Sequence, residues 1–278
     1  MDIILKISEE LGIRKNQTEV AVKLIDEGNT IPFIARYRKE VTGSLNDEVL
    51  RNLYERLTYL RNLEERKETV LGSIEEQGKL TEELKKQILA AETMVAVEDL
   101  YRPYKPKRRT RATIAKEKGL EPLANVIALQ MIHTSLEAEA EKYVNPEKEV
   151  HSAEEAVAGA KDILAEAVSD EADYRTKIRE LTVKKGHVTS TAKNPETESV
   201  YEMYYEFDEP VNKLAGHRIL ALNRGENEKI LNVKVEAPEE EILRYLERKV
   251  ITKDNPMTTP VLKEVVADAY DRLIAPAI

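Results

Sequence analysis

The sequence predicts a mainly α-helical protein: an elongated scaffold of many helices, with a helix-turn-helix-like part and a minor β element. Apolar residues recur three and four positions apart over most of the chain, which is the helical period. Glu, Lys, Leu and Ala are abundant and favour helices, whereas the 278 residues include only 10 Gly and 11 Pro, too few for a protein of many turns. One stretch, residues 230–235, alternates between apolar and polar residues and is the best candidate strand.

Capping and turn residues mark the helices expected in the first part of the chain. Asn46 can cap the longest helix, with Asp47 and Glu48 in its first turn, where carboxylates are favourable. That helix should run to about Gln77 and stop at Gly78, with a seam of leucines along one face. The other helices are expected at 3–11, from Thr18 as a cap to Gly28, from Pro32 to Gly43, and after Thr81 and Thr93.

A basic stretch with two prolines follows, from Val97 to Arg111. Pro103 and Pro106 fix φ and remove two backbone donors, so this stretch is expected to form an extended or turn-like arm. A stiff basic arm with aromatic faces suits phosphate and base contacts, although the same cations can instead pair with acidic helices of this chain. The candidate nucleic-acid-binding residues on the arm are Tyr101, Arg102, Tyr104, Lys105, Lys107, Arg108, Arg109 and Arg111.

A second basic cluster comprises Arg36, Arg38 and Lys39 beside Phe33 and Tyr37. It has the same combination of cations and aromatic faces, so its three cations are further candidate nucleic-acid contacts. The alternative is that Phe33 faces the core while the arginines hold the ends of helices. The sequence leaves both interpretations open.

A tight corner between two helices is expected after the arm. Thr110 can cap a helix that ends at Gly119, and Pro122 opens the next helix. Two helices joined by such a turn have the shape of a helix-turn-helix or an α-hairpin.

Helices continue to predominate in the remainder of the chain. Ser152 and Glu155 form a capping box for an alanine-rich helix, in which Gly159 is expected to serve close packing. The apolar stripe of the last helix, 261–274, is too wide to leave in water, so it should pack on helices of this chain or on a missing domain. The other expected elements are a helix from Ser169 to about Gly186, a helix at 214–222 stopped by Arg224-Gly225, and a helix opened by Pro238. Residues 201–207 are expected to form a helix, although their alternation also fits a strand.

The polar stretch 186–199 is the candidate domain boundary. We expect an N-terminal helical domain at 1–190 that contains the basic arm. A second, mostly helical segment is expected at 191–278, with the one candidate strand.

The sequence contains no recognisable catalytic or ligand-binding motif. His133, His151, His187 and His217 stand far apart, without the spacing of metal ligands, and no glycine-rich phosphate-binding motif occurs. We therefore expect no metal, no cofactor and no enzymatic activity. The chain has no cysteine, a net charge of −9 and no apolar run of membrane length, and residues 1–14 lack the apolar run and cleavage site typical of a signal peptide. These features indicate a soluble cytoplasmic protein without a membrane partner.

Several runs of residues, in order and over nearly the whole chain, resemble the Tex family of bacterial transcription accessory proteins. They are Ile31–Gly43, Gln77–Thr81, Glu98–Ala112, Gly119–Ala124, Gly159–Glu166 and His217–Gly225. The family places a ribonuclease-H-like domain, helix-hairpin-helix motifs and a C-terminal OB-fold RNA-binding domain after this region. The resemblance therefore implies an N-terminal fragment that leads to an absent ribonuclease-H-like domain. One departure is Leu214-Ala215-Gly216, where the family usually has a proline-serine pair, and it leaves the start of the helix at His217 open.

The resemblance also implies a function, that of the non-catalytic N-terminal module of a nucleic-acid-binding transcription accessory factor. RNA is the expected partner and DNA the second candidate, bound weakly and without sequence preference. The alternative is an acidic helical scaffold that docks the transcription or translation machinery through RNA polymerase or the ribosome. The oligomeric state is left open.

Overall fold

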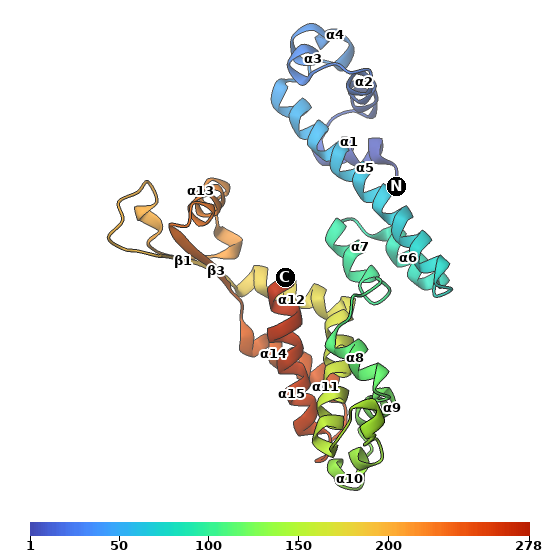
Figure 1. The fold of residues 1–278 in the computed structure, drawn as a ribbon. Coiled ribbons are helices and arrows are strands. Elements are labelled where there is room, and N and C mark those ends of the chain that lie inside the picture. Colours follow the sequence, from blue (N-terminus) through green and yellow to red (C-terminus); the bar gives the residue numbers. More distant parts are fainter. The chain divides into compact units, whose positions relative to one another are not determined.

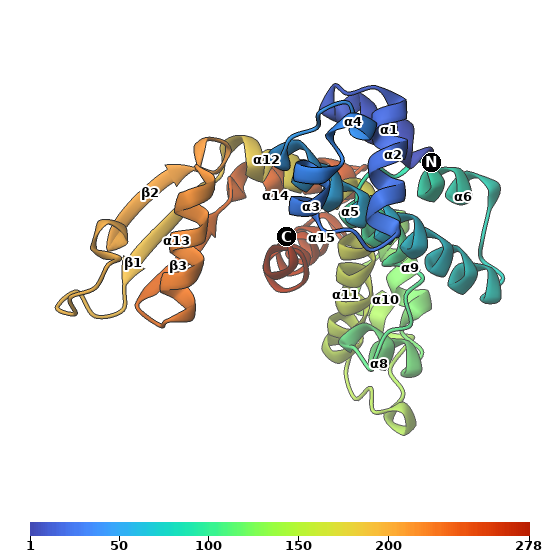
Figure 2. The same ribbon diagram turned by 90° about the horizontal axis from the view of Figure 1, so that it is seen from above.

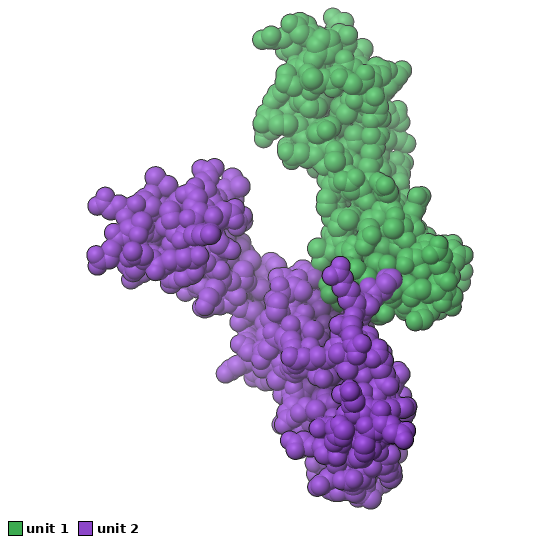
Figure 3. Space-filling model, in the orientation of Figure 1, with its two compact units in different colours: residues 1–105 green, residues 106–278 purple.

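The computed structural model describes all 278 residues and is mainly helical with a minor β element, as the sequence predicts; the β element is a three-stranded antiparallel sheet (Figure 1 and Figure 2). The chain forms two compact units, Met1–Lys105 and Pro106–Ile278 (Figure 3). The boundary expected near residue 190 lies inside a strand, β1 (His187–Ala192), whereas the division between the units lies within the predicted basic arm. No helix combines the length and the apolar character needed to cross a membrane.

Unit 1 is organised around its longest helix, α5 (Asp47–Glu76). This helix is capped as predicted, because the Asn46 side chain accepts a hydrogen bond from the Val49 amide at 2.8 Å. The leucines from Leu50 to Leu63 that face the core at helical spacing are buried. Around α5 lie α1 (Ile3–Leu11), α2 (Lys15–Asp26), α3 (Ile31–Tyr37), α4 (Lys39–Thr42), α6 (Glu82–Ala90) and α7 (Met94–Tyr101). All of these except α4 pack on α5, and α4 packs on α2 and α3.

The predicted cap of α2 is wrong. The helix begins at Lys15, because the Gln17 side chain accepts a hydrogen bond from the Arg14 amide at 3.0 Å and supports this earlier start. Thr18 lies inside the helix and is buried, and its hydroxyl is hydrogen-bonded to that of Ser8 at 2.8 Å. Thr18 therefore joins α2 to α1 instead of capping α2.

The helix expected between Pro32 and Gly43 is interrupted at Arg38. The backbone of Arg38 has φ −128° and ψ 28°, outside the helical region, so α3 ends at Tyr37 and α4 begins at Lys39. Gly43, at φ +67°, ends α4 as predicted, because glycine adopts this left-handed conformation without strain. The second basic cluster therefore lies at a junction between two short helices.

The helical part of unit 2 is built on α11 (Ala153–Asp170), which packs against α8, α9, α10, α12 and α15. The predicted helix-turn-helix-like corner is present, because α8 and α9 are joined through Gly119 at φ +77°. The other helices of this part are α8 (Arg111–Glu117), α9 (Glu121–Leu129), α10 (Leu136–Glu141), α12 (Ala172–Lys185), α14 (Glu239–Val250) and α15 (Thr259–Asp268). Short 3₁₀ helices cover Pro146–Lys148 and Ala275–Ala277, and a π-helical stretch covers Ala269–Ile274.

Gly159 serves packing, as predicted. A Cβ atom at this position would lie 2.3 Å from Leu120 Cδ1 and 3.3 Å from Ala115 Cβ. The missing side chain therefore lets α11 approach the corner between α8 and α9.

The apolar stripe of the last helix is covered within this chain. Val261, Leu262, Val265 and Val266 are at most 8% exposed and share one core with residues of α11 and α14. The sequence leaves open whether this stripe packs on helices of this chain or on a missing domain. The structure shows that it packs on the helices of unit 2.

Ser169 does not begin a helix, contrary to the prediction. It lies at the end of α11, and the chain bends at Glu171 before α12. The Arg175 side chain, only 1% exposed, donates hydrogen bonds to the Ser169 carbonyl at 2.5 Å and to its hydroxyl at 2.8 Å. It also donates to the Leu273 carbonyl at 3.3 Å, so this buried cation ties the bend to the π-helical stretch.

The sheet has the strand order β2–β1–β3, with β2 (Glu206–Pro210) and β3 (Leu231–Glu236) both antiparallel to β1 (Figure 2). Ser190, in β1, pairs with Phe207 on one side and Val233 on the other. Helix α13 (Gly216–Asn227) packs against β3, and 3₁₀ turns at Glu202–Tyr204 and Val211–Lys213 flank β2. The predicted strand is confirmed as β3.

The helix expected at 201–207 is wrong. Tyr201 and Tyr204 are buried in one core with Leu222 and Leu231, so the chain makes a single 3₁₀ turn there before it enters β2. Spacing alone fits a helix or a strand, and burial against the sheet decides between them. β1 lies within the polar stretch 186–199, where the sequence predicts a domain boundary. The sequence does not predict this strand, because its residues are mostly small and polar.

Gly225 does not stop α13, which continues to Asn227. A Cβ atom at Gly225 would lie 2.4 Å from Leu231 Cδ1, so this glycine allows α13 to approach β3. The turn after the helix is made by Lys229 at φ +62°. The helix begins at Gly216, so the departure from the family pattern at Leu214–Gly216 does not prevent it from forming.

Candidate nucleic-acid interface

The predicted basic arm is extended only over its last part. Residues from Val97 to Tyr101 belong to α7, and Arg102 caps that helix. The helix ends just before Pro103. Proline disfavours helical structure at its own position and at the residue before it, so residues further upstream can still be helical. Only Pro106–Thr110 has neither helix nor hydrogen-bonded turn.

Tyr101 offers no ring face for stacking, contrary to the prediction. It is buried, its hydroxyl lies 3.0 Å from Ser73 Oγ, and the Arg66 guanidinium lies 5.3 Å from its ring centroid. Arg66 is itself paired with Glu98 through two hydrogen bonds, at 2.5 and 3.2 Å. Tyr101 therefore belongs to the core and polar network of unit 1.

The other candidates in unit 1 differ in exposure. Tyr104 is half-buried, and its carbonyl accepts a hydrogen bond from Gln77 Nε2 at 2.8 Å. Arg102 is also half-buried, and its Nε atom is buried without a partner. Lys105 is exposed and forms no ion pair, so it is the most accessible cation of this part of the arm.

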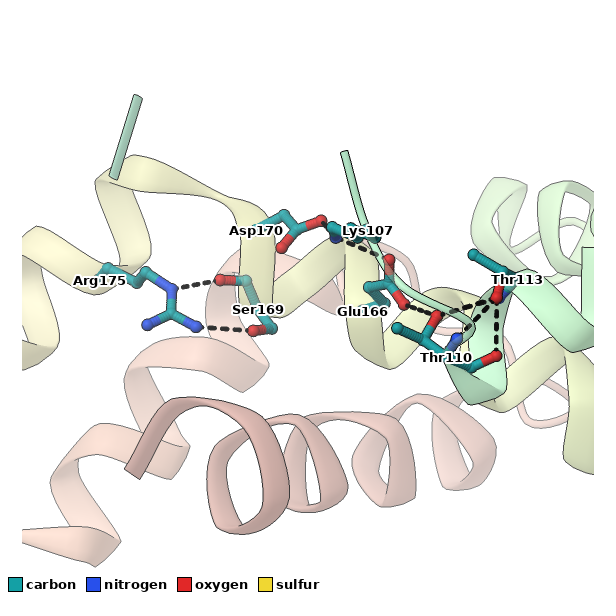
Figure 4. A network of polar contacts seen from close by, with 7 residues as sticks. All are labelled: Lys107, Thr110, Thr113, Glu166, Ser169, Asp170 and Arg175. Atoms are coloured by element: carbon teal, nitrogen blue, oxygen red, sulfur yellow. Dashed lines mark hydrogen bonds and ion pairs between the residues drawn. The ribbon is translucent and has the colours of Figure 1, made fainter. Parts of the chain in front are cut away.

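Lys107, in unit 2, is held by two carboxylates of α11. Its Nζ atom lies 2.6 Å from Glu166 Oε1 and also contacts Asp170 (Figure 4). The Thr110 hydroxyl donates to the other oxygen of Glu166 at 2.9 Å. Burial alone would raise the pKa of the Glu166 carboxyl, but the hydrogen bonds from Lys107 and Thr110 outweigh it and hold that pKa below its ordinary value. Lys107 is therefore paired with an acidic helix of this chain, as the second interpretation of the arm describes.

The three arginines that follow are exposed. Arg108 forms no ion pair. Arg109 lies 3.4 Å from Glu117, but the two side chains are 70% and 61% exposed, so this pair is weak. Arg111 begins α8 and interacts electrostatically with Asp162 and Asp268 without forming an ion pair. Arg108, Arg109 and Arg111 are the accessible phosphate-binding candidates of unit 2 and are called the arginine run below.

The second basic cluster forms a layer of rings and guanidinium groups on the surface of unit 1. The Phe33 and Tyr37 ring centroids lie 5.2 Å apart. The Arg38 guanidinium lies 4.9 Å from the Phe33 centroid, and that of Arg36 lies 5.9 Å from the Tyr37 centroid. Together with Lys39, these residues are called the Tyr37 cluster below.

Phe33 does not fill the core, as the alternative interpretation would require. The residue that enters the core is the next one, Ile34, which is fully buried, while Phe33 is half-buried and Tyr37 is 59% exposed. Arg38 does donate a hydrogen bond to the Tyr37 carbonyl at 3.0 Å, so one arginine holds a helix end as that interpretation proposed.

The histidines and carboxylates do not converge on a metal centre. No three side chains of His, Asp or Glu come together in an arrangement that could hold a metal ion. His187 is paired with Asp208 at 2.6 Å between β1 and β2, and both side chains are largely exposed.

Two compact helical units, one with a small antiparallel sheet, define the class of protein: a multi-helix scaffold that displays exposed basic clusters. Residues 1–75 match the Tex-like protein N-terminal domain, and residues 133–271 match the Tex central region-like family. The chain belongs to the Tex family of transcription accessory proteins. The Tyr37 cluster lies within the first match, and the arginine run lies between the two matches.

Related proteins extend this similarity. The chain is 48% identical to protein YdcI of Bacillus subtilis over 98% of its length, which is 38% of that protein. It is 46% identical to transcriptional accessory protein Tex of Neisseria gonorrhoeae over 84% of its length, or 31% of that protein. It is 28% identical to S1 RNA-binding domain-containing protein 1 of Homo sapiens over its whole length, which is 29% of that protein. The chain thus spans about a third of the length of these relatives.

Proposed function

We propose that this chain is a non-catalytic, nucleic-acid-binding module of a transcription accessory protein and acts in the cytoplasm. It takes RNA, or DNA as a second candidate, weakly and without sequence preference. The observation that carries the proposal is the arginine run, whose three side chains are exposed beside an anchored Lys107. In a chain with a net charge of −9, exposed cations without firm partners are the groups expected to meet phosphates.

The anchoring of Lys107 favours phosphate binding by its neighbours. Lys107 and Thr110 both bond to Glu166, so the backbone that carries Arg108 and Arg109 is fixed at two points. A backbone that is already ordered loses less entropy when its side chains meet a ligand. Arginine also presents a planar fork that grips a phosphate through two hydrogen bonds.

The relatives support the same function by their names. One is named a transcriptional accessory protein, and another is named for an S1 RNA-binding domain. Contacts without base readout would give binding that is independent of sequence, because phosphates carry no sequence information.

The test is the salt dependence of binding to labelled single-stranded RNA and to duplex DNA of the same length. The variant Arg108→Ala/Arg109→Ala should lower the slope of log K against log salt by about 1.4 to 1.8, if each arginine neutralises one phosphate. A matched control is Arg244→Ala/Arg248→Ala on α14, which removes the same charge from two exposed arginines and should leave the slope unchanged. Equal binding by the wild type and the Arg108→Ala/Arg109→Ala variant would contradict the proposal. The alternative of an acidic scaffold that docks RNA polymerase or the ribosome would then be favoured.

A further inference from the structure

We infer that the Tyr37 cluster is a stacking site for an unpaired base, so that the ligand of this module is a single-stranded nucleic acid. The inference rests on the proposed function and narrows its substrate class. It concerns a surface of unit 1 that the arginine run does not include.

The cluster borders an open hollow that can receive a planar ring. The hollow has a volume of about 700 Å³, within the range of small-ligand sites. Phe33, Arg36, Tyr37 and Lys39 line it together with Pro32, Ala35, Asn46 and Asp47. Tyr37 is 59% exposed, so its ring is accessible to a base beside the Arg36 guanidinium, which lies 5.9 Å from the ring centroid. Stacking on an aromatic ring is available to every base, because every base has a π face.

The Phe33 and Tyr37 rings are held in position by contacts of α3 with the core and by hydrogen bonds at both ends of this helix. Ile34 is fully buried against the core of unit 1, and the Thr30 hydroxyl caps α3 by accepting a hydrogen bond from the Phe33 amide at 3.3 Å. Arg38 packs over Phe33 and donates to the Tyr37 carbonyl at 3.0 Å. The platform therefore exists before a ligand arrives, which lowers the entropy cost of binding.

The cations of the cluster are free to meet a phosphate backbone. Arg36, Arg38 and Lys39 form no ion pair, whereas four other arginines of unit 1 are paired, in Arg51–Asp47, Arg56–Glu10, Arg61–Asp26 and Arg66–Glu98. The acidic residue of the hollow, Asp47, has Arg51 as its partner in an exposed ion pair. Among the residues next to these three cations in sequence, Glu40 is the one exposed carboxylate. The local net charge is therefore positive, although the chain as a whole is acidic.

The combination of an exposed ring and free cations distinguishes a single strand from a duplex. In a duplex both faces of each base are covered by its neighbours, so stacking on Tyr37 would first require the base to leave the helix, at a cost of a few kcal/mol. In a single strand the base is available while its phosphates reach Arg36 and Lys39. We therefore expect the cluster to add affinity for single strands alone.

The experiment measures anisotropy with three labelled probes of equal length: a single-stranded DNA, the same strand with abasic sites, and the duplex. Tyr37→Ala should weaken binding to the single strand by about fivefold to a hundredfold, the range for loss of one stacked base. It should leave the abasic and duplex probes unchanged, because their phosphates remain but no unpaired base does. Tyr37→Phe keeps the ring and should bind like the wild type. The matched control is Tyr54→Ala on α5, another tyrosine at the surface, 46% exposed, whose loss should change nothing.

A second pair of variants tests the cations. Arg36→Ala/Lys39→Ala should weaken binding to the single strand and lower its salt slope by about 1.4, at 0.7 for each phosphate of a single strand. Lys85→Ala/Lys86→Ala on α6 removes the same charge from exposed residues of unit 1 and should leave the slope unchanged.

The outcomes separate this inference from the proposed function. If Tyr37→Ala binds the single strand like the wild type, or weakens all three probes equally, the stacking site is refuted. If Arg108→Ala/Arg109→Ala still lowers the salt slope in that case, the proposed function stands without the stacking site. If neither variant changes binding to any probe, both proposals fall.

Discussion

Lys107 and Glu166 hold the basic segment of unit 2 on α11, with Nζ and Oε1 2.6 Å apart (Figure 4). The two residues are 59 positions apart in sequence. This contact turns one of the predicted phosphate-binding cations into an anchor for its neighbours. Because the pair is partly buried, it is screened less by salt than an exposed pair.

Glu166→Gln should weaken this anchor. At neutral pH we expect a loss of about 1 kcal/mol in the free energy of unfolding, because the pair is partly exposed and Thr110 can still bond to the new side chain. Thermal melting followed by circular dichroism should show a midpoint lower by roughly 2 to 4 °C. Glu117→Gln, which removes the exposed partner of Arg109, serves as the control and should change the midpoint much less.

The same variant predicts a dependence on pH. The pKa of Glu166 is lowered in the folded protein, so its contribution to stability is present above the ordinary glutamate value of 4.5 and is lost as the pH falls through the folded pKa. The midpoints of the wild type and Glu166→Gln should therefore differ at pH 7 and converge below pH 4.5. A difference that stays constant down to low pH would mean that Glu166 stabilises the fold through its shape and not its charge.

Val265→Asp should destabilise unit 2 strongly. Val265 is 1% exposed in the core that α15 shares with α11 and α14, so the substitution would bury a carboxylate without a partner. We expect a loss of at least about 3 kcal/mol, measured by urea denaturation. Lys263→Asp places the same carboxylate on the exposed face of α15 and should cost much less. Equal effects of the two variants would show that the apolar stripe is not the source of stability.

Gly225→Ala should destabilise the sheet region although alanine favours helices. The new Cβ would lie 2.4 Å from Leu231 Cδ1 and 3.3 Å from the Tyr201 ring, so packing must shift. We expect a net loss of about 1 to 2 kcal/mol, overpacking outweighing the helix propensity gained. The control is Gly72→Ala in α5, where nothing lies within 4 Å of the new Cβ. That substitution should stabilise unit 1 by up to about 1 kcal/mol. A gain in both variants would contradict the close contact at Gly225.

The two compact units should fold separately. Each has its own apolar core, and the division lies between Lys105 and Pro106. Segments 1–105 and 106–278 produced alone should each show a helical spectrum and a cooperative melting transition. As a control, a cut at residue 190 would divide β1, and the resulting segment 191–278 should fail to fold because β1 is the central strand of the sheet. A folded 191–278 segment would support the boundary expected from the sequence instead.

The differences between expectation and structure follow one pattern. Thr18 and Ser169 both have the side chain of a helix cap, but each is buried inside a helix and bonds to another element. The apolar residues of 201–207 fit a helix or a strand by spacing, and the burial of Tyr201 and Tyr204 with Leu231 decides the outcome. In each case the local pattern permits two structures, and a contact with a residue of another element selects one.

The sequence by itself determined the mainly helical class, the long capped helix α5, the packing role of Gly159 and the strand β3. These features depend on the period of apolar residues, on capping side chains and on the absence of a side chain, which are local properties of the chain. Only the tertiary structure decided which cations are free. Lys107 and Arg108 are adjacent in sequence, yet one meets Glu166 and the other meets solvent. The reason is that an ion pair depends on distance through space, and that distance is set by how α11 packs, not by the residues next to either charge.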